Sequence, residues 1–200
     1  MLKRLQALTA AAATLTLACC ANTYNPLEGY EQVQPVAGLD SPDATASSYP
    51  AGQVDRGRYL TDLLGCGNCH TDGVLIGQPN AARLLAGSEV GIARSNPMVE
   101  RDPGIVYPAN ITPDLETGIG EWTLEEIETL LQSGIDNHGT QTLLVMPWLN
   151  YSRLLPEDAT AIAMYLKSLP PIEHQVPANV LPGQRATAPF VHFGTYRSQQ

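Results

Sequence analysis

The sequence predicts an all-α fold in which a few helices are joined by long loops and followed by an extended C-terminal tail. Three segments repeat apolar residues at the spacing of a helix, and no segment alternates convincingly between apolar and polar residues. The chain of 200 residues also contains 16 prolines and 17 glycines, which favour irregular connections. A chain of this length fits one domain with extensions.

The first 21 residues are expected to be an export signal. Leu5–Ala18 is an apolar stretch too short for a stable transmembrane helix, and two basic residues precede it. The letters LTLACC resemble a bacterial lipoprotein signal, in which Cys19 or Cys20 becomes the lipidated first residue. We expect this form, anchored to the membrane by its acyl chains. The alternative is cleavage after Ala21, which gives a soluble periplasmic protein.

A tether and the first helix follow the signal. Residues 22–53 are rich in Pro, Ser, Ala and Thr and lack periodicity, so we expect a flexible tether. The predicted domain occupies residues 54–172. Its first helix spans 54–65, where Asp55 can cap the N-terminus. The apolar face expected for this helix consists of Tyr59, Leu60, Leu63 and Leu64.

The second predicted helix lies in WTLEEIETLLQSG, residues 122–134. Before it, residues 71–121 show no sustained period, and so long a loop is unusual in a compact domain unless it wraps something. Thr123 and Glu126 have the spacing of a capping box, and Gly134 is expected to end the helix. The apolar face consists of Leu124, Ile127, Leu130 and Leu131.

The third predicted helix lies in LPEDATAIAMYLKSLPP. Pro156 suits the first helical position, the two acidic residues after it suit the helix dipole, and Pro170-Pro171 stop the helix. The expected buried stripe consists of Ala159, Ile162, Ala163, Leu166 and Leu169. The remaining residues, 173–200, are expected to form an extended, Pro-rich tail over the surface.

The stretch CGNCH, residues 66–70, suggests three chemistries. A thioredoxin-like redox pair follows a strand in an alternating α/β chain. Here a predicted helix precedes the motif, and the sequence shows no alternation of strands and helices. A structural zinc site needs four ligands, and no second cysteine pair exists in the mature chain. The form C-x-x-C-H is that of c-type haem attachment. On a helical turn Cys66, Cys69 and His70 face one side, so two thiols and an imidazole can meet one haem.

A second iron ligand has to come from elsewhere in the chain. Met146 precedes Pro147 and an aromatic residue on a short, stiff loop, which is well placed to reach an iron. Its soft thioether would favour reduced iron and raise the reduction potential. The weaker candidates are Met98 in a polar loop, Met164 in the last helix, His138 in a solvated turn, and His174 and His192, both expected to be exposed in the tail.

Several stretches together resemble bacterial class I c-type cytochromes, especially the haem domains of alcohol and aldehyde dehydrogenase cytochrome c subunits. The matching stretches, between residues 55 and 172, are CGNCHT, LLAG, VYPANITPDLETGIGEWT, LLQSG, MPW and EDATAIAMYLKSLPP. The resemblance implies a class I cytochrome c fold around one covalently bound haem c. It implies that Cys66 and Cys69 bind the haem and that His70 is the proximal iron ligand. It further implies that Met146 is the distal ligand.

The resemblance also identifies a helix contact and three departures. Gly57 and Tyr165 match the residues through which the family's first and last helices pack closely. The family's subunits usually carry three haem domains, whereas this chain has one haem motif. Residues 88–102 form a longer loop than the family's, and Leu155-Pro156 replace a capping Ser-Asp pair.

The resemblance and the haem motif lead to one expected function. We expect a mono-haem electron carrier, not an enzyme, that passes single electrons between a periplasmic dehydrogenase and the respiratory chain. The formal net charge of −9 argues against a nucleic acid partner, because nucleic acid binding requires a basic face. Two alternatives remain: haem as a structural or interaction element of a dehydrogenase complex, and a five-coordinate haem that acts on peroxide or binds a gas.

Overall fold

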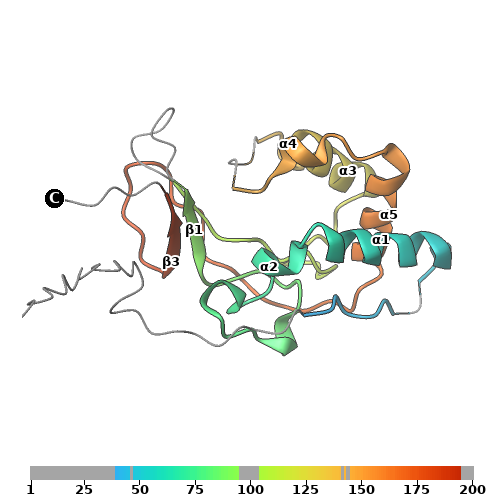
Figure 1. Ribbon diagram of the computed structural model, residues 1–200, viewed down its shortest axis with the longest axis horizontal. Coiled ribbons are helices and arrows are strands. Elements are labelled where there is room, and N and C mark those ends of the chain that lie inside the picture. The colour runs from blue at the N-terminus through green and yellow to red at the C-terminus, as the bar shows by residue number, and fades with distance from the viewer. Residues whose placement is uncertain (1–38, 46, 95–103, 141, 143–144, 195–200) are drawn as a thin grey trace, which may run out of the picture. The chain divides into compact units, whose positions relative to one another are not determined.

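Helices dominate the described part of the chain, but a small sheet accompanies them. The computed structural model describes residues 39–45, 47–94, 104–140, 142 and 145–194, all within one compact unit, Gln34–Gln200. These residues form five α-helices, two short 3-10 helices and a three-stranded sheet (Figure 1). The all-α fold class is therefore not confirmed. The expected export signal with Cys19 and Cys20, and Met98, lie outside the described residues.

Helices α1 (Ala51–Leu63) and α5 (Pro156–Lys167) pack against each other at Gly57. A Cβ atom at this glycine would lie 2.0 Å from the Ala161 carbonyl oxygen and 2.7 Å from the Tyr165 Cβ. Any larger residue would therefore separate the helices. The close contact expected between Gly57 and Tyr165 is present. Arg56 and Asp158 add an ion pair beside it, with Nε and Oδ1 2.9 Å apart.

Two predictions about α1 are wrong. The helix starts at Ala51 after Pro50, and no side chain caps it, so Asp55 lies inside the helix. Tyr59 and Leu63 were expected on the apolar face, but they are 54% and 63% exposed. The buried face follows the contact with α5 instead and consists of Val54, Gly57, Leu60 and Thr61.

The predicted ends of α3 (Leu124–Ser133) are confirmed. The Thr123 hydroxyl accepts from the Glu126 backbone N–H at 3.2 Å, and the Glu126 carboxylate accepts from the Thr123 backbone N–H at 2.7 Å. Gly134 ends the helix in the left-handed region, with φ 71°. Because both termini are satisfied by local groups, the sequence alone located this helix.

The last long helix, α5, also agrees with the sequence. Pro156 occupies its first turn and all five residues of the expected stripe are buried. A short helix that was not predicted, α4 (Trp148–Tyr151), follows Pro147 and leads to α5. No helix among the described residues combines the length and the apolar character needed to cross a bilayer.

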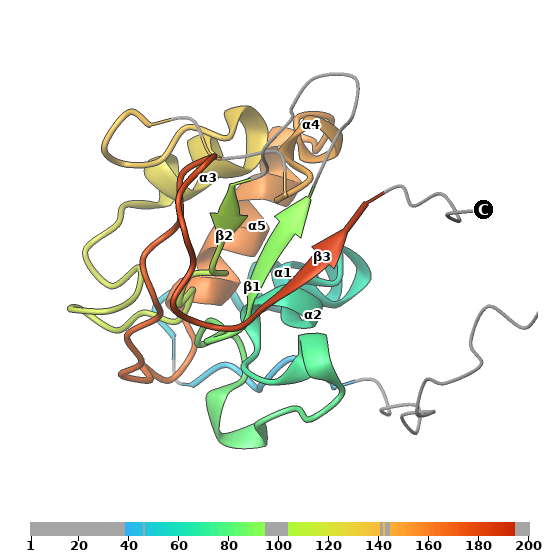
Figure 2. The same cartoon turned by 90° about the vertical axis from the view of Figure 1, so that its left-hand side faces the viewer.

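The sheet joins two segments that lie far apart in the sequence. Strand β1 (Gly91–Arg94) pairs antiparallel with β2 (Ile105–Val106) and parallel with β3 (Phe190–Phe193), and Figure 2 shows the three side by side. Strand β1 belongs to the segment 88–102, and β3 belongs to the expected tail 173–200. Strands of two to four residues are too short to show an alternating pattern, which explains why the sequence did not predict them.

Residues 41–45 and 47–49, within the segment expected to be a tether, pack against the helices. The Ser41 N–H donates to the Asp62 carboxylate at 3.0 Å, and the Tyr165 hydroxyl donates to the Pro42 carbonyl at 2.6 Å. The Thr45 N–H donates to the Ser168 carbonyl at 2.8 Å. These bonds link this segment to α1 and to the end of α5.

Candidate functional site

The cysteine motif forms a helical turn of its own, α2 (Cys66–His70). Gly65 separates it from α1 by adopting the left-handed region, with φ 69°. The two thiols and the imidazole are spaced i, i+3 and i+4 on this turn and therefore project from one side, as the sequence indicated. Cys66 and Cys69 are free thiols, each partly buried.

The imidazole of His70 is oriented by one hydrogen bond. Its Nδ1 lies 2.7 Å from the Ala109 carbonyl oxygen, and because a carbonyl only accepts, Nδ1 carries the proton. The lone pair of Nε2 is then available to a metal. Burial lowers the pKa of His70 and outweighs the opposite effect of this hydrogen bond. A neutral imidazole with a fixed tautomer is the form that binds a metal.

The two thiols lie in an apolar environment. Burial raises the pKa of Cys66 to about 11 and also raises the pKa of Cys69. Both thiols are therefore protonated at neutral pH. Tyr151 of α4 belongs to the core against which Cys66 packs. Burial raises the pKa of Tyr151 to about 12, and the two cysteines add a smaller effect in the same direction. Its hydroxyl donates to the Leu64 carbonyl at 3.5 Å.

Cys66 and Met146 pack against the same core. Met146 is half-buried, and its carbonyl accepts from the Trp148 backbone N–H at 2.8 Å. The buried residues of this core include Leu60, Leu85, Ile119, Ile127, Leu131, Tyr151, Ile162 and Leu166. The structure thus places Met146 and Cys66 against one core cluster.

The indole of Trp148 contains a buried hydrogen-bond donor, Nε1–H, that is unsatisfied among the described residues. Gly134 makes room for the ring, since a Cβ there would lie 2.6 Å from the indole. A buried donor without a partner costs about 1–3 kcal/mol. Independently of this indole, two thiols, a neutral imidazole and a thioether beside an apolar core fit a haem c.

The other candidate ligands lie in different environments. Met164 is half-buried in α5, whereas His138 is exposed in a turn and His192 is exposed on β3. The expectation that His174 is exposed is wrong, because it is only 5% exposed. Its Nδ1 donates to the Ala86 carbonyl at 2.7 Å.

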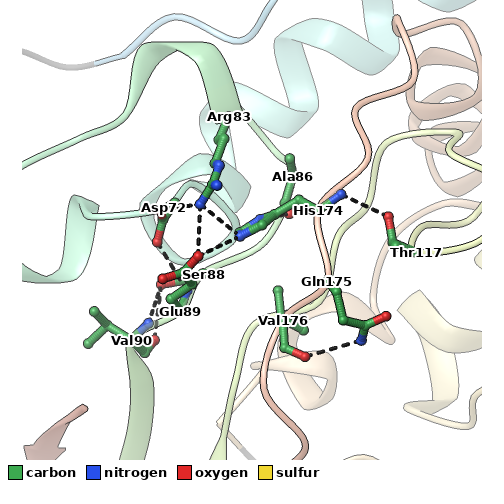
Figure 3. Close-up of polar contacts among 10 residues, drawn as sticks. All are labelled: Asp72, Arg83, Ala86, Ser88, Glu89, Val90, Thr117, His174, Gln175 and Val176. Atoms are coloured by element: carbon green, nitrogen blue, oxygen red, sulfur yellow. Dashed lines mark hydrogen bonds and ion pairs between the residues drawn. The ribbon is translucent and has the colours of Figure 1, made fainter. Parts of the chain in front are cut away.

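His174 belongs to a polar cluster that also contains Asp72, Arg83 and Glu89 (Figure 3). Asp72, Glu89 and His174 bring their ligand atoms within 4.8 Å of one another, a spacing suited to a metal ion. Arg83 Nη1 lies between them, however, at 3.0 Å from Asp72, 2.9 Å from Glu89 and 3.0 Å from His174 Nε2. The guanidinium is therefore the cation of this cluster.

Sequence reasoning missed two residues around the site, Ala109 and Tyr151, and wrongly expected His174 to be exposed. Ala109 acts through its backbone carbonyl, which carries no residue-specific signal. Tyr151 follows MPW within one helical turn. This spacing could have indicated that Tyr151 lies near Met146, but it carries no signal for a position near Cys66. His174 is a lone histidine among prolines, and nothing in the local sequence indicates burial.

Comparison with known proteins gives relatives but no matching family model. The chain is 34% identical over 141 residues to the fructose dehydrogenase cytochrome subunit of Gluconobacter japonicus, covering 70% of this chain and 26% of that protein. It is 34% identical over 123 residues to the cytochrome c subunit of the quinone alcohol dehydrogenase of Gluconobacter oxydans, covering 61% and 23%. It is 31% identical over 112 residues to the cytochrome c subunit of the gluconate 2-dehydrogenase of Pantoea cypripedii, covering 56% and 22%.

These relatives confirm the resemblance to dehydrogenase cytochrome c subunits. The chain spans about a quarter of the length of each of these three proteins. The similarity therefore concerns one part of each relative.

Proposed function

We propose that this chain is a mono-haem c-type cytochrome that carries single electrons between a periplasmic dehydrogenase and the respiratory chain. Cys66 and Cys69 hold the haem through thioether bonds, His70 is the proximal iron ligand and Met146 is the distal ligand. The haem supplies an iron that takes up and releases one electron at a time. The chain itself binds and shields this group and performs no bond-making chemistry on a substrate.

One observation carries the proposal: the geometry of α2. Two free thiols and an imidazole share one turn, and the bond from His70 Nδ1 to the Ala109 carbonyl frees Nε2 on the same imidazole. A metal-binding histidine typically donates its other ring N–H to a carbonyl or a carboxylate in this way. The presence of a single C-x-x-C-H motif in the sequence supports one haem per chain.

The distal assignment rests on the apolar region shared by Met146 and Cys66. A thioether ligand stabilises ferrous iron relative to ferric iron and raises the potential, which suits an electron carrier. With Met146 as the distal ligand, the iron would have no open position for peroxide or a gas. For this reason we favour electron transfer over a five-coordinate haem.

The partner and the location follow from the relatives and the N-terminus. Relatives named as cytochrome subunits of fructose, alcohol and gluconate dehydrogenases support a dehydrogenase as electron donor. The signal-like N-terminus supports export to the periplasm, with a lipid anchor on Cys19 or Cys20. The acceptor is a component of the respiratory chain.

The proposal is tested by a redox titration of the exported protein combined with carbon monoxide binding. We expect a single one-electron transition and a reduced form that binds carbon monoxide slowly or not at all. A reversible transition with rapid carbon monoxide binding would support the five-coordinate alternative. Co-purification with a dehydrogenase that cannot reduce the haem would support the structural alternative.

A further inference from the structure

We infer that His174, on the segment after α5, is a positioning residue for the proximal imidazole of His70. This inference rests on the proposed function, because it assigns His70 to the iron. His174 does not touch the site itself. It fixes the neighbouring segment 83–89, and that segment holds the main chain from which His70 projects.

Residues 70–72 are attached to residues 85–89 by hydrogen bonds. Three backbone N–H groups of the second segment donate to the first: Leu85 to the Thr71 hydroxyl (3.1 Å), Gly87 to the His70 carbonyl (2.8 Å) and Glu89 to the Asp72 carboxylate (3.1 Å). Thr71 and Gly87 also form an isolated parallel bridge. The position of the His70 backbone therefore depends on the position of residues 85–89.

Residues 85–89 do not hold their conformation by themselves. Leu85 adopts φ 60°, a left-handed conformation that costs a leucine free energy. Gly87 is so crowded that a Cβ there would lie 2.6 Å from Val176 Cγ1 and 2.8 Å from the Asn110 nitrogen. A strained, crowded segment persists only where surrounding groups fix it.

His174 is the side chain that ties this segment to the chain after α5, beside two backbone bonds to the 108–111 segment: Ser88 N–H to the Pro108 carbonyl (2.9 Å) and Ile111 N–H to the Leu85 carbonyl (3.0 Å). The His174 Nδ1 donates to the Ala86 carbonyl at 2.7 Å, and its Nε2 accepts from Arg83 Nη1 at 3.0 Å (Figure 3). Arg83 in turn binds the carboxylates of Asp72 and Glu89. One buried imidazole thus joins Arg83 and Ala86, its Nε2 lies 3.3 Å from Glu89 Oε1, and through Arg83 it reaches Asp72, two residues after His70.

The backbone of His174 makes a contact of its own, separate from those of the side chain. The His174 N–H donates to the Thr117 hydroxyl at 3.0 Å, and that hydroxyl also accepts from the Asn110 amide at 3.0 Å. Asn110 is the neighbour of Ala109, whose carbonyl orients His70. A substitution at His174 keeps this backbone bond and removes only the side-chain bonds to Ala86 and Arg83. We therefore expect the main chain of residues 70–72 to loosen relative to Ala109.

The consequence for the iron follows from the hydrogen bond of the proximal ligand. A strong Nδ1–H···O=C bond makes the imidazole a better electron donor, which stabilises ferric iron. When the His70 main chain moves relative to Ala109, this bond weakens. We therefore expect the reduction potential to rise and the orientation of the imidazole to change.

The test uses the haem-loaded full chain and three variants. His174→Phe keeps the size of the side chain and removes both hydrogen bonds. His174→Gln can still donate to Ala86 and accept from Arg83. Ile162→Val, in the fully buried part of α5, lowers stability without touching the cluster. The readouts are the electron paramagnetic resonance g-values of the oxidised form, the midpoint potential, and hydrogen exchange at the Gly87 amide.

Relative to the wild type, we expect His174→Phe to shift the g-values, raise the potential and speed exchange at Gly87 about tenfold or more. His174→Gln should restore most of each signal, and Ile162→Val should lower Tm alone. Wild-type g-values and potential in His174→Phe would overturn the inference. Equal shifts in Ile162→Val would overturn it too, because the effect would then be a general loss of stability. Equal shifts in His174→Gln would also overturn it, because the effect would then come from loss of the ring and not from loss of the two hydrogen bonds.

If His174→Phe yields no loaded protein, His174→Asn replaces it, since its shorter amide cannot span both Ala86 and Arg83; the same shifts support the inference, and unchanged values overturn it. If the wild type carries no covalent haem, the proposed function fails first and the inference falls with it. Unchanged values in a loaded variant overturn the inference alone.

Discussion

The hydrogen bond between His70 and the Ala109 carbonyl decides which chemistry this imidazole can perform. With Nδ1–H committed, only Nε2 can bind a metal, and burial lowers the pKa of the ring so that it stays neutral. Neither property requires a charged neighbour. At the scale of single residues, one backbone carbonyl and the apolar groups around the ring therefore leave Nε2 as the free nitrogen of a neutral imidazole.

Replacement of Met146 by alanine tests the distal ligand. We expect Met146→Ala to lose the weak near-infrared absorption of methionine-bound ferric iron, to lower the potential and to make the reduced form reactive toward carbon monoxide. Met164→Ala, a second half-buried methionine, is the control and should keep all three properties. An unchanged spectrum in Met146→Ala would shift the assignment to Met98 or a histidine.

The predictability of the site depends on how far apart its residues lie in the sequence. The arrangement of Cys66, Cys69 and His70 could be predicted because one helical turn determines it. The contacts of His70 with Ala109 and of His174 with Ala86 join residues 39 and 88 positions apart. No local pattern encodes such contacts, which is why His174 was expected to be exposed.

At the scale of elements, Gly57 controls how closely α1 and α5 approach. Gly57→Ala places a Cβ 2.0 Å from the Ala161 carbonyl oxygen, so the helices must separate. We expect the free energy of unfolding to fall by about 3 kcal/mol, measured by chemical denaturation. Gly52→Ala is the matched control in the same helix, because nothing lies within 4 Å of its Cβ position. It should raise stability by roughly 0.5–1 kcal/mol, and equal losses in both variants would contradict the packing argument.

The capping box of α3 predicts a specific pH dependence. Hydrogen bonds from the backbone N–H and the hydroxyl of Thr123 lower the pKa of Glu126. The ionised carboxylate therefore stabilises the fold at neutral pH, and this contribution is lost as the pH falls through the lowered pKa. Glu126→Gln should be less stable than the wild type at pH 7, and the difference should shrink at about pH 3.

The control for this experiment is Glu125→Gln in the same turn of α3. Its side chain is not part of the capping box. Thermal unfolding of both variants at the two pH values separates the capping bond from the general interaction of acidic residues with the helix dipole. Equal, pH-independent losses in the two variants would contradict the role given to the capping box.

The elements also differ in how well the sequence predicts them. Helices α3 and α5 were predicted with their ends, because Thr123, Gly134 and Pro156 are local signals. The start of α1 was misplaced, since Pro50 replaces a side-chain cap. The strands were missed because their pairing joins residues 91–94 with 105–106 and 190–193.

At the scale of the whole molecule, one buried amide connects the segment after β2 with the segment after α5. Asn110 is 2% exposed and donates to the Thr117 hydroxyl and the Ile172 carbonyl, while its oxygen accepts from Thr112. Asn110→Ala would leave several of these buried groups unpaired. We expect a loss of about 3 kcal/mol in the free energy of unfolding.

The control for Asn110 is Asn150→Ala, an exposed asparagine in α4. Its removal should change the free energy of unfolding by no more than about 0.5 kcal/mol. A comparable loss in both variants, measured by chemical denaturation, would show that Asn110 does not join the two segments.

The central claim is that the turn Cys66–His70 carries one covalently bound haem, and the intact mass of the denatured, exported protein measures this directly. We predict one haem per chain that remains attached after denaturation, with the c-type α-band in the reduced spectrum and loss of the attached haem in the double variant Cys66→Ala, Cys69→Ala. A chain that carries no haem, or that releases its haem on denaturation, would contradict the account.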